Sequence, residues 1–122
     1  MAPDTPHLAQ FLPLTPATFH ILLALAGGEK HGYAIMQEVS ERSAGQITLG
    51  PGTLYGAIRR LRQVGWIEES DERPDPALDD ERRRYYRLTD LGCRVASAEA
   101  ERLARLTDEA QKRGLLPTPG QV

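Results

Sequence analysis

Cysteine and long apolar runs are both scarce in this sequence. Cys93 is the only cysteine among 122 residues, so the chain contains no disulfide framework and suits a reducing compartment. No apolar run approaches the roughly 18 residues of a membrane-spanning helix. The first residues also lack the basic start and apolar core of a secretory signal. From the sequence we expect a cytoplasmic protein that does not enter a membrane.

The residue patterns of a catalytic or metal site are also lacking. His7, His20, His31 and Cys93 show no metal-ligand spacing, so we expect no metal and no cofactor. No nucleophile stands beside a base, and the Gly-Pro-Gly segment at 50–52 is too short for a loop that cradles a phosphate. The sequence therefore favours a function other than catalysis.

Acidic residues are absent from residues 51–65, although the whole chain has a formal net charge of −2. That stretch carries three arginines, whereas residues 68–81 are strongly acidic with only Arg73 opposing, and residues 82–87 contain four more arginines. Segregated charges create a local basic surface on an acidic molecule, and the local potential governs the binding of a polyanion. The net charge therefore does not exclude a nucleic-acid partner.

The acid-free stretch has the pattern of an amphipathic helix. Pro51 suits a first helical turn, where its missing N–H costs nothing, and the flanking glycines let the chain turn sharply into it. One side carries apolar residues at helical spacing, namely Leu54, Ala57, Ile58, Leu61 and Gly65. The other side carries Gly56, Arg59, Arg60 and Gln63, with Tyr55 and Arg62 on one flank and Thr53 on the other. A short helix that is rich in arginine, free of acids and small at its start can enter a DNA major groove.

Two further helices are predicted before this one. Thr15 is a suitable N-cap with Pro16 at the first helical position, and the glycines at 27–28 end this helix. Its apolar face is predicted to consist of Phe19, Leu22, Leu23 and Ala26. Residues 29–33 are predicted to form a polar turn, followed by a second helix that ends near residues 43–45. The buried face of this second helix is predicted to consist of Ile35, Met36 and Val39.

After the basic helix the period changes to that of strands. Residues 66–69 and 84–88 are predicted to form two short strands, the second rich in aromatic residues. Residues 70–81 between them hold two prolines and many acids, so we expect a mobile hairpin tip. The order of elements over residues 15–88 is that of a winged helix-turn-helix domain, preceded by a flexible or partly docked arm at residues 1–14. We therefore predict a mainly α fold with a small β wing.

A long last helix is predicted at residues 89–114, with Thr89 as its N-cap and Gly114 after its end, followed by a disordered tail at 115–122. Its apolar stripe shifts partway along. The first face, expected to pack on its own domain, consists of Leu91, Val95 and Ala98. The second face, expected to join a partner subunit in a homodimer, consists of Ala100, Leu103, Leu106 and Ala110.

Together these stretches resemble the PadR family of winged-helix repressors. The resemblance covers about residues 14–106 and rests on Leu-Thr-Pro at 14–16, Gly-Glu-Lys-His-Gly-Tyr at 28–33, Leu-Gly-Pro-Gly-Thr-Leu-Tyr at 49–55 and Arg-Arg-Tyr-Tyr-Arg-Leu-Thr at 83–89. It implies a homodimer joined through the C-terminal helices that binds a two-fold symmetric operator in double-stranded DNA and represses transcription. We expect an effector, for which a small molecule is a candidate, to release the DNA by changing the geometry of the dimer.

The resemblance also assigns positions to contacts. It places Tyr33 in the second helix near the DNA backbone, residues 53, 55 and 59 in the reading helix, and the arginine run 82–84 at the wing. With the basic helix, the predicted DNA-binding residues are Lys30, Tyr33, Thr53, Tyr55, Arg59, Arg60, Arg62, Gln63, Arg83 and Arg84. Trp66 departs from the family, which more often has an aliphatic residue there.

Other interpretations stay open at several of these positions. The arginines of the basic helix could form an ordinary solvated face, and Tyr55 could pack rather than contact a phosphate. Arg83 and Arg84 could pair with the acids at 79–81, although surface ion pairs yield readily to a polyanion. Lys30 is as well suited to a role within the fold as to a phosphate contact.

The alternative function is a winged helix that binds another protein through its acidic loop and does not bind DNA.

Three single residues also have two interpretations each. Cys93 is either a small filler or a redox switch, and Trp66 either covers the core edge or lines an effector cavity. His31 is expected to cap or pack at a helix start.

Overall fold

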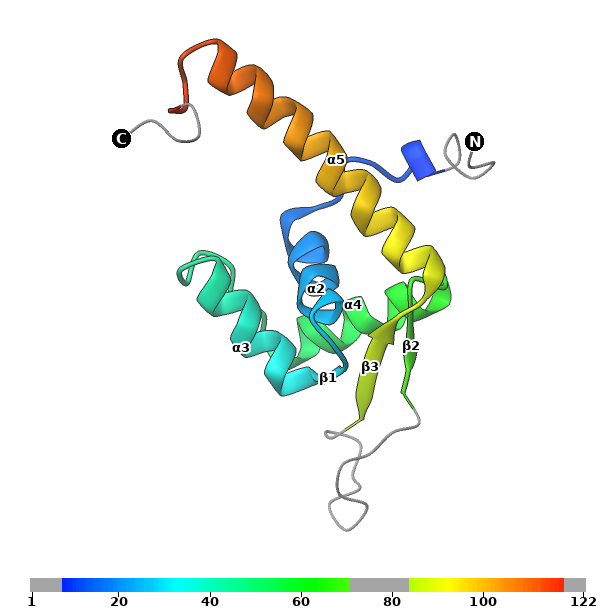
Figure 1. Cartoon of the computed structure of the whole chain (residues 1–122). Coiled ribbons are helices and arrows are strands. Elements are labelled where there is room, and N and C mark those ends of the chain that lie inside the picture. Colours follow the sequence, from blue (N-terminus) through cyan, green and yellow to red (C-terminus); the bar gives the residue numbers. More distant parts are fainter. Residues whose placement is uncertain (1–7, 71–83, 118–122) are drawn as a thin grey trace.

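The computed structural model of the protein describes residues 8–70 and 84–117. Its elements follow one another as α2 (Pro16–Ala26), β1 (Lys30–His31), α3 (Gly32–Arg42), α4 (Pro51–Gln63), β2 (Ile67–Glu69), β3 (Tyr85–Leu88) and α5 (Asp90–Lys112), as seen in Figure 1. The three strands form one antiparallel sheet in the order β1-β3-β2. The fold is therefore mainly helical with a small β wing, which confirms the predicted fold class.

Helix α2 begins as predicted but buries a different face. The backbone N–H of Thr18 donates to Thr15 Oγ1 at 3.2 Å, so Thr15 is the N-cap. The buried residues are Ile21, Leu22, Ala24 and Leu25. Of the predicted face only Leu22 is buried, while Phe19 and Leu23 are half-buried and Ala26 is exposed. Nearly every residue from 19 to 26 is apolar, so periodicity alone could not select the face that packs.

The predicted polar turn at residues 29–33 is also wrong in part. Lys30 and His31 form strand β1, which pairs with Tyr86 and Tyr85 of β3. A two-residue strand has no period of its own, and its partner lies far along the chain. The sequence therefore held no local signal for a third strand.

Helices α3 and α4 form the helix-turn-helix. His31 Nδ1 accepts the backbone N–H of Ala34 at 3.1 Å and so caps α3, as expected. Helix α3 buries Gly32, Ile35 and Val39, whereas Met36 is only half-buried. Helix α4 buries four of the five residues predicted for its apolar side, Leu54, Ala57, Ile58 and Leu61, whereas Gly65 lies beyond the end of the helix and is half-buried. The burial of this one stripe fixes which side of α4 points outward.

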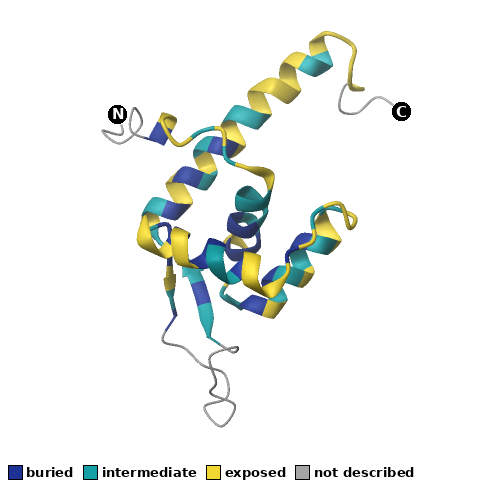
Figure 2. Cartoon of the chain, turned by 180° about the vertical axis from the view of Figure 1, so that it is seen from behind, coloured by how far each residue is buried: buried dark blue, intermediate teal, exposed yellow. Residues whose placement is uncertain are grey.

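The core lies between α2, α3, α4, the inner face of the β2–β3 wing and the first half of α5 (Figure 2). Its fully enclosed side chains include Ile21, Leu22, Ile35, Leu54, Ile67 and Val95. Trp66 is 7% exposed and its ring meets Phe11 edge-on at 5.4 Å between centroids. Trp66 therefore covers the edge of the core.

The segment before α2 is docked where the structure describes it. Leu8 is buried in the core, and the backbone N–H of Leu14 donates to Glu99 Oε2 of α5 at 3.0 Å. Glu99 is 2% exposed and also pairs with Arg102 at 2.5 Å. These contacts correspond to the partly docked form of the predicted arm, of which residues 1–7 lie outside the described part.

Helix α5 packs with its first half and extends beyond the domain with its second (Figure 1). Thr89 is its N-cap, as predicted, because its Oγ1 accepts the Gly92 N–H at 3.0 Å. Its buried residues, Gly92, Val95 and Glu99, all lie in that first half. Within residues 8–70 and 84–117, no helix is both long and apolar enough to span a membrane.

Candidate nucleic-acid interface

The outward face of α4 is open to solvent at both of its ends, and Gly56 between them is half-buried. Thr53, Arg59, Arg60 and Gln63 are exposed. Gly50 caps the helix without a side-chain hydrogen bond, so N–H groups of the first turn remain available to an acceptor. A Cβ added at Gly50 or Gly52 would meet nothing within 4 Å, so the start of α4 is unobstructed. The geometry therefore allows a large anionic partner to approach α4 closely.

Two arginines in the C-terminal half of this face have no carboxylate partner among the described residues. Among the residues that the structure describes, neither Arg59 nor Arg60 takes part in an ion pair. An arginine without a carboxylate partner presents its guanidinium donors to whatever binds next to it. This arrangement differs from an ordinary surface helix, in which pairs three or four residues apart neutralise one another.

Arg62 on the flank of α4 reaches toward the wing. Its Nη2 lies 3.8 Å from Glu69 Oε2 on β2, and Arg84 Nη1 lies 3.6 Å from the same oxygen. Burial and, after it, the Glu69 carboxylate raise the pKa of the neighbouring Tyr86 hydroxyl, while Arg62 and Arg84 oppose this rise. Arg83, the other predicted wing contact, lies outside the described residues.

Tyr55 joins the two helices of the helix-turn-helix. A Cβ added at Gly32, the first residue of α3, would lie 2.5 Å from the Tyr55 hydroxyl oxygen, so the ring packs directly on that turn. The side chain is half-buried against the core. Tyr55 therefore packs, and its predicted phosphate contact stays a prediction. Tyr33, the next residue of α3, is 59% exposed, and its hydroxyl accepts a hydrogen bond from Gln37 Nε2 at 3.3 Å.

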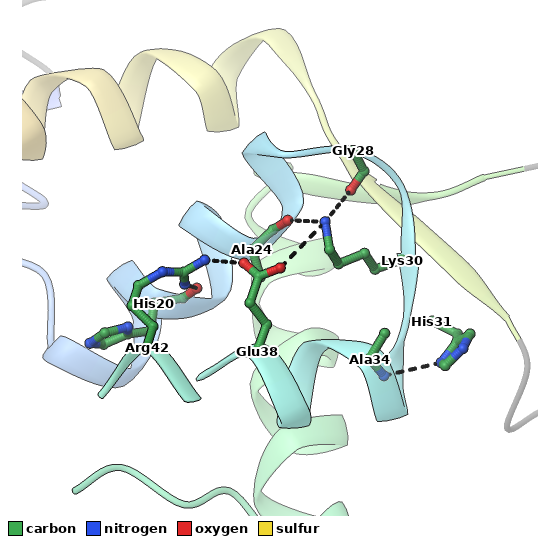
Figure 3. A network of polar contacts seen from close by, with 8 residues as sticks. All are labelled: His20, Ala24, Gly28, Lys30, His31, Ala34, Glu38 and Arg42. Carbon is green, nitrogen blue, oxygen red and sulfur yellow. Dashed lines mark hydrogen bonds and ion pairs between the residues drawn. The ribbon is translucent and has the colours of Figure 1, made fainter. Parts of the chain in front are cut away.

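Lys30 is held within the fold. Its ammonium donates to the carbonyl oxygen of Ala24 at 2.7 Å and to that of Gly28 at 3.5 Å, and it lies 3.7 Å from Glu38 of α3 (Figure 3). A cation at a helix C-terminus satisfies carbonyls that have no partner within the helix. Lys30 thus caps α2 and links it to α3, so a phosphate contact would require it to share or leave these partners.

The other polar contacts between α2 and α3 were not predicted from the sequence. Glu38 also pairs with Arg42, whose guanidinium donates to the carbonyl oxygen of His20 on α2 at 3.4 Å (Figure 3). Glu38 and Arg42 stand four residues apart on one helix, which is a recognisable pair spacing. The contacts to α2 carry no such signal, because they depend on how two helices cross.

Other predicted features are placed as follows. Cys93 is exposed in the first turn of α5. Among the described residues no three histidine, cysteine or acidic side chains come together to hold a metal ion. The predicted dimer face on α5 consists of Ala100 and Leu106, which are exposed, and Leu103 and Ala110, which are half-buried.

A helix-turn-helix followed by a β wing defines the winged helix-turn-helix class. The chain belongs to the PadR-like family of transcriptional regulators, whose sequence profile matches residues 21–98. Members of this family are transcriptional regulators and not enzymes, so the resemblance drawn from the sequence is confirmed.

Two curated relatives are longer than the matched region. The chain is 38% identical over 87 residues to an uncharacterised 37.1 kDa protein in transposon TN4556 of Streptomyces fradiae, a match that covers 71% of this chain and 23% of the relative. It is 33% identical over 72 residues to an uncharacterised protein X of Lysinibacillus sphaericus, covering 59% of this chain and 63% of the relative. The chain thus spans less than two thirds of the length of either relative.

Solved structures share the fold. A Streptococcus transcriptional regulator is 25% identical with a TM-score of 0.63, covering 80% of this chain and 90% of its own. A complex structure of hsRosR-S4 is 26% identical with a TM-score of 0.61, covering 76% and 73%. A PadR family transcription regulator from Clostridium difficile, 22% identical with a TM-score of 0.62 and covering 82% and 98%, supports the fold alone.

Proposed function

We propose that this chain is a sequence-specific DNA-binding repressor that acts as a homodimer and inserts α4 into the major groove. The observation that carries the proposal is the exposed, acid-free face of α4, on which Arg59 and Arg60 have no ion pair among the described residues. Arginine is the side chain best suited to guanine edges and to phosphates, because its planar fork donates two parallel hydrogen bonds.

The surrounding residues take supporting roles in this proposal. Thr53 and Gln63 stand at the two ends of the exposed face and would contact base edges or phosphates. Tyr33 would contact the backbone from α3, and Arg84 would contact it from the wing. Lys30 contributes through its place at the end of α2, where it holds α2 against α3.

The homodimer would form through the second half of α5. That half extends past the domain, and Leu106 on it is 57% exposed and shares one side of the helix with Leu103 and Ala110, so the three residues offer a partner an apolar stripe. Two copies joined there would present their α4 helices to successive major grooves, about 34–36 Å apart. An effector molecule would then release DNA by shifting the population of dimers away from this spacing.

The test compares binding of three proteins to a duplex that the wild type enriches from a random pool. Arg59→Ala with Arg60→Ala should bind at least about 30-fold more weakly, since a good bidentate base contact contributes about 1–3 kcal/mol. Arg105→Ala with Lys112→Ala is the matched control, because both side chains are exposed on the side of α5 opposite Leu106 and carry the same charge. The control should bind within about twofold of the wild type.

Two outcomes would contradict the proposal. Equal binding by the wild type and the α4 variant would remove Arg59 and Arg60 from the mechanism. Background binding by every protein at low salt would instead favour a winged helix that contacts another protein.

A further inference from the structure

Glu69 occupies the point where the reading helix meets the wing. Its Oε2 atom lies 3.8 Å from Nη2 of Arg62 on α4. The same atom lies 3.6 Å from Nη1 of Arg84, the residue that immediately precedes β3. One carboxylate oxygen therefore holds a guanidinium from each of the two parts of the domain that are expected to contact DNA.

The strand register fixes this meeting point. Glu69 lies directly opposite Tyr86 on β3, and Arg84 is two residues from Tyr86, so all three side chains share the wing face that looks toward α4. Ile67 and Leu88, also opposite each other, continue the same face into the core. Tyr86 is 5% exposed and belongs to the core cluster. The convergence on Glu69 is thus built by the sheet rather than by the long side chains alone.

We propose that Arg62 and Arg84 form a clamp for a single DNA phosphate, and that Glu69 occupies this clamp in the free protein as an internal competitor. The inference rests on the proposed function and adds a specific site to it. A carboxylate and a phosphate both offer paired oxygens to guanidinium groups, so one can replace the other. The side chains of Arg62 and Arg84 are 46% and 39% exposed, whereas that of Glu69 is 23% exposed, so a phosphate can reach both arginines from solvent.

The exchange is favoured because the Arg62–Glu69 and Arg84–Glu69 ion pairs are long. Ion pairs at these distances and exposures contribute little, because water and salt screen them. A phosphate that replaces Glu69 also releases the counterions condensed on DNA. The same carboxylate would disfavour anions that cannot engage both arginines together, so Glu69 sets a threshold for binding.

Glu68 supplies a matched control on the same strand. It precedes Glu69 and points to the opposite face of the wing, where its carboxylate accepts from Arg87 Nε at 2.8 Å. Its side chain is 49% exposed. Replacing Glu68 changes the net charge of β2 by the same amount as replacing Glu69, but leaves the clamp unchanged.

The experiment measures affinity for two duplexes of equal length, one enriched from a random pool by the wild type and one shuffled, over a range of salt. Glu69→Gln should bind both duplexes about three- to tenfold more tightly, because the competitor is lost. Its plot of log affinity against log salt should steepen by up to about one. Glu68→Gln should stay within about twofold of the wild type.

A set of arginine variants tests the clamp separately. Arg62→Ala and Arg84→Ala should each weaken binding, and together they should weaken it by less than the product of their single effects, because both hold one phosphate. In the double arginine variant, Glu69→Gln should improve binding by less than about twofold. The effects of the arginine substitutions alone decide the matter even if Glu69→Gln fails to fold.

The failures are distinguishable. If the wild type binds DNA, any of three results would overturn the clamp and leave the proposed function intact. These are a Glu69→Gln variant that binds no more tightly than the wild type, an equal gain in affinity from Glu68→Gln, and effects of the two arginine substitutions that simply multiply. Absence of binding by the wild type and by Glu69→Gln on both duplexes at low salt would overturn both.

Discussion

Gly92 offers the most direct test of how α5 packs against Trp66, the residue that precedes strand β2 of the wing. A Cβ added at Gly92 would lie 1.9 Å from the carbonyl oxygen of Trp66 and 2.8 Å from its carbonyl carbon. Both are backbone atoms, so no side-chain rotation can relieve the overlap. The same carbonyl accepts the N–H of Thr89 at 3.1 Å, and this bond would break if α5 moved away.

The expected loss of stability in Gly92→Ala follows from these contacts. Overpacking that shifts backbone costs about 1–3 kcal/mol, and a buried carbonyl left without its donor costs about 1–3 kcal/mol. Alanine recovers about 1 kcal/mol of helix propensity relative to glycine. We therefore expect Gly92→Ala to lower the free energy of unfolding by about 2–4 kcal/mol, or the melting temperature by about 10–20 °C for a domain of this size.

Gly56→Ala is the control for this prediction. The nearest atom to its added Cβ is Arg60 Nη1 at 3.7 Å, the end of a flexible side chain, so the substitution should stabilise the helix by about 0.5–1 kcal/mol. Both variants are followed by urea and thermal unfolding at one protomer concentration. A Gly92→Ala variant as stable as the wild type would refute the seating of α5 described above.

Further predictions concern the buried carboxylate, the dimer and a helix cap. The Arg102 guanidinium and, after it, the Leu14 N–H hold the pKa of Glu99 below its ordinary 4.5. Glu99→Gln should therefore lower the free energy of unfolding by about 1–3 kcal/mol at pH 7. This loss should become smaller as the pH falls below 4.5, and a loss that does not change with pH would contradict the assignment. Leu106→Glu should shift sedimentation toward the monomer, and an unchanged dimer would place the interface elsewhere. His31→Ala should cost about 1 kcal/mol in urea unfolding through loss of the α3 cap, and no loss would show that the cap is dispensable.

The reading helix could be predicted from the sequence because every signal in it agrees. Pro51 starts it, the apolar residues have one period, and the acid-free face is unambiguous once the apolar stripe is buried. The caps at Thr15 and Thr89 were equally local, since a single side chain determines each. Features encoded within one turn of helix were thus accessible without a structure.

The remaining features depend on contacts between distant segments. Strand β1 exists only because β3 pairs with it, and the buried face of α2 is selected by its neighbours rather than by its own uniform apolar pattern. The role of Lys30 in capping α2 and the shared position of Glu69 between two arginines also require knowledge of how elements cross. Charge patterning located the basic region but could not indicate which arginines are held internally.

The measurement that tests the central claim most directly is a footprint at guanine N7 on the duplex enriched by the wild type. Because α4 is proposed to lie in the major groove of two half-sites, protection should fall on two patches about 10 base pairs apart on that groove. Arg59→Ala with Arg60→Ala should remove both patches together. A bound duplex with no protection at guanine N7, or two patches that persist in the variant, would contradict the account.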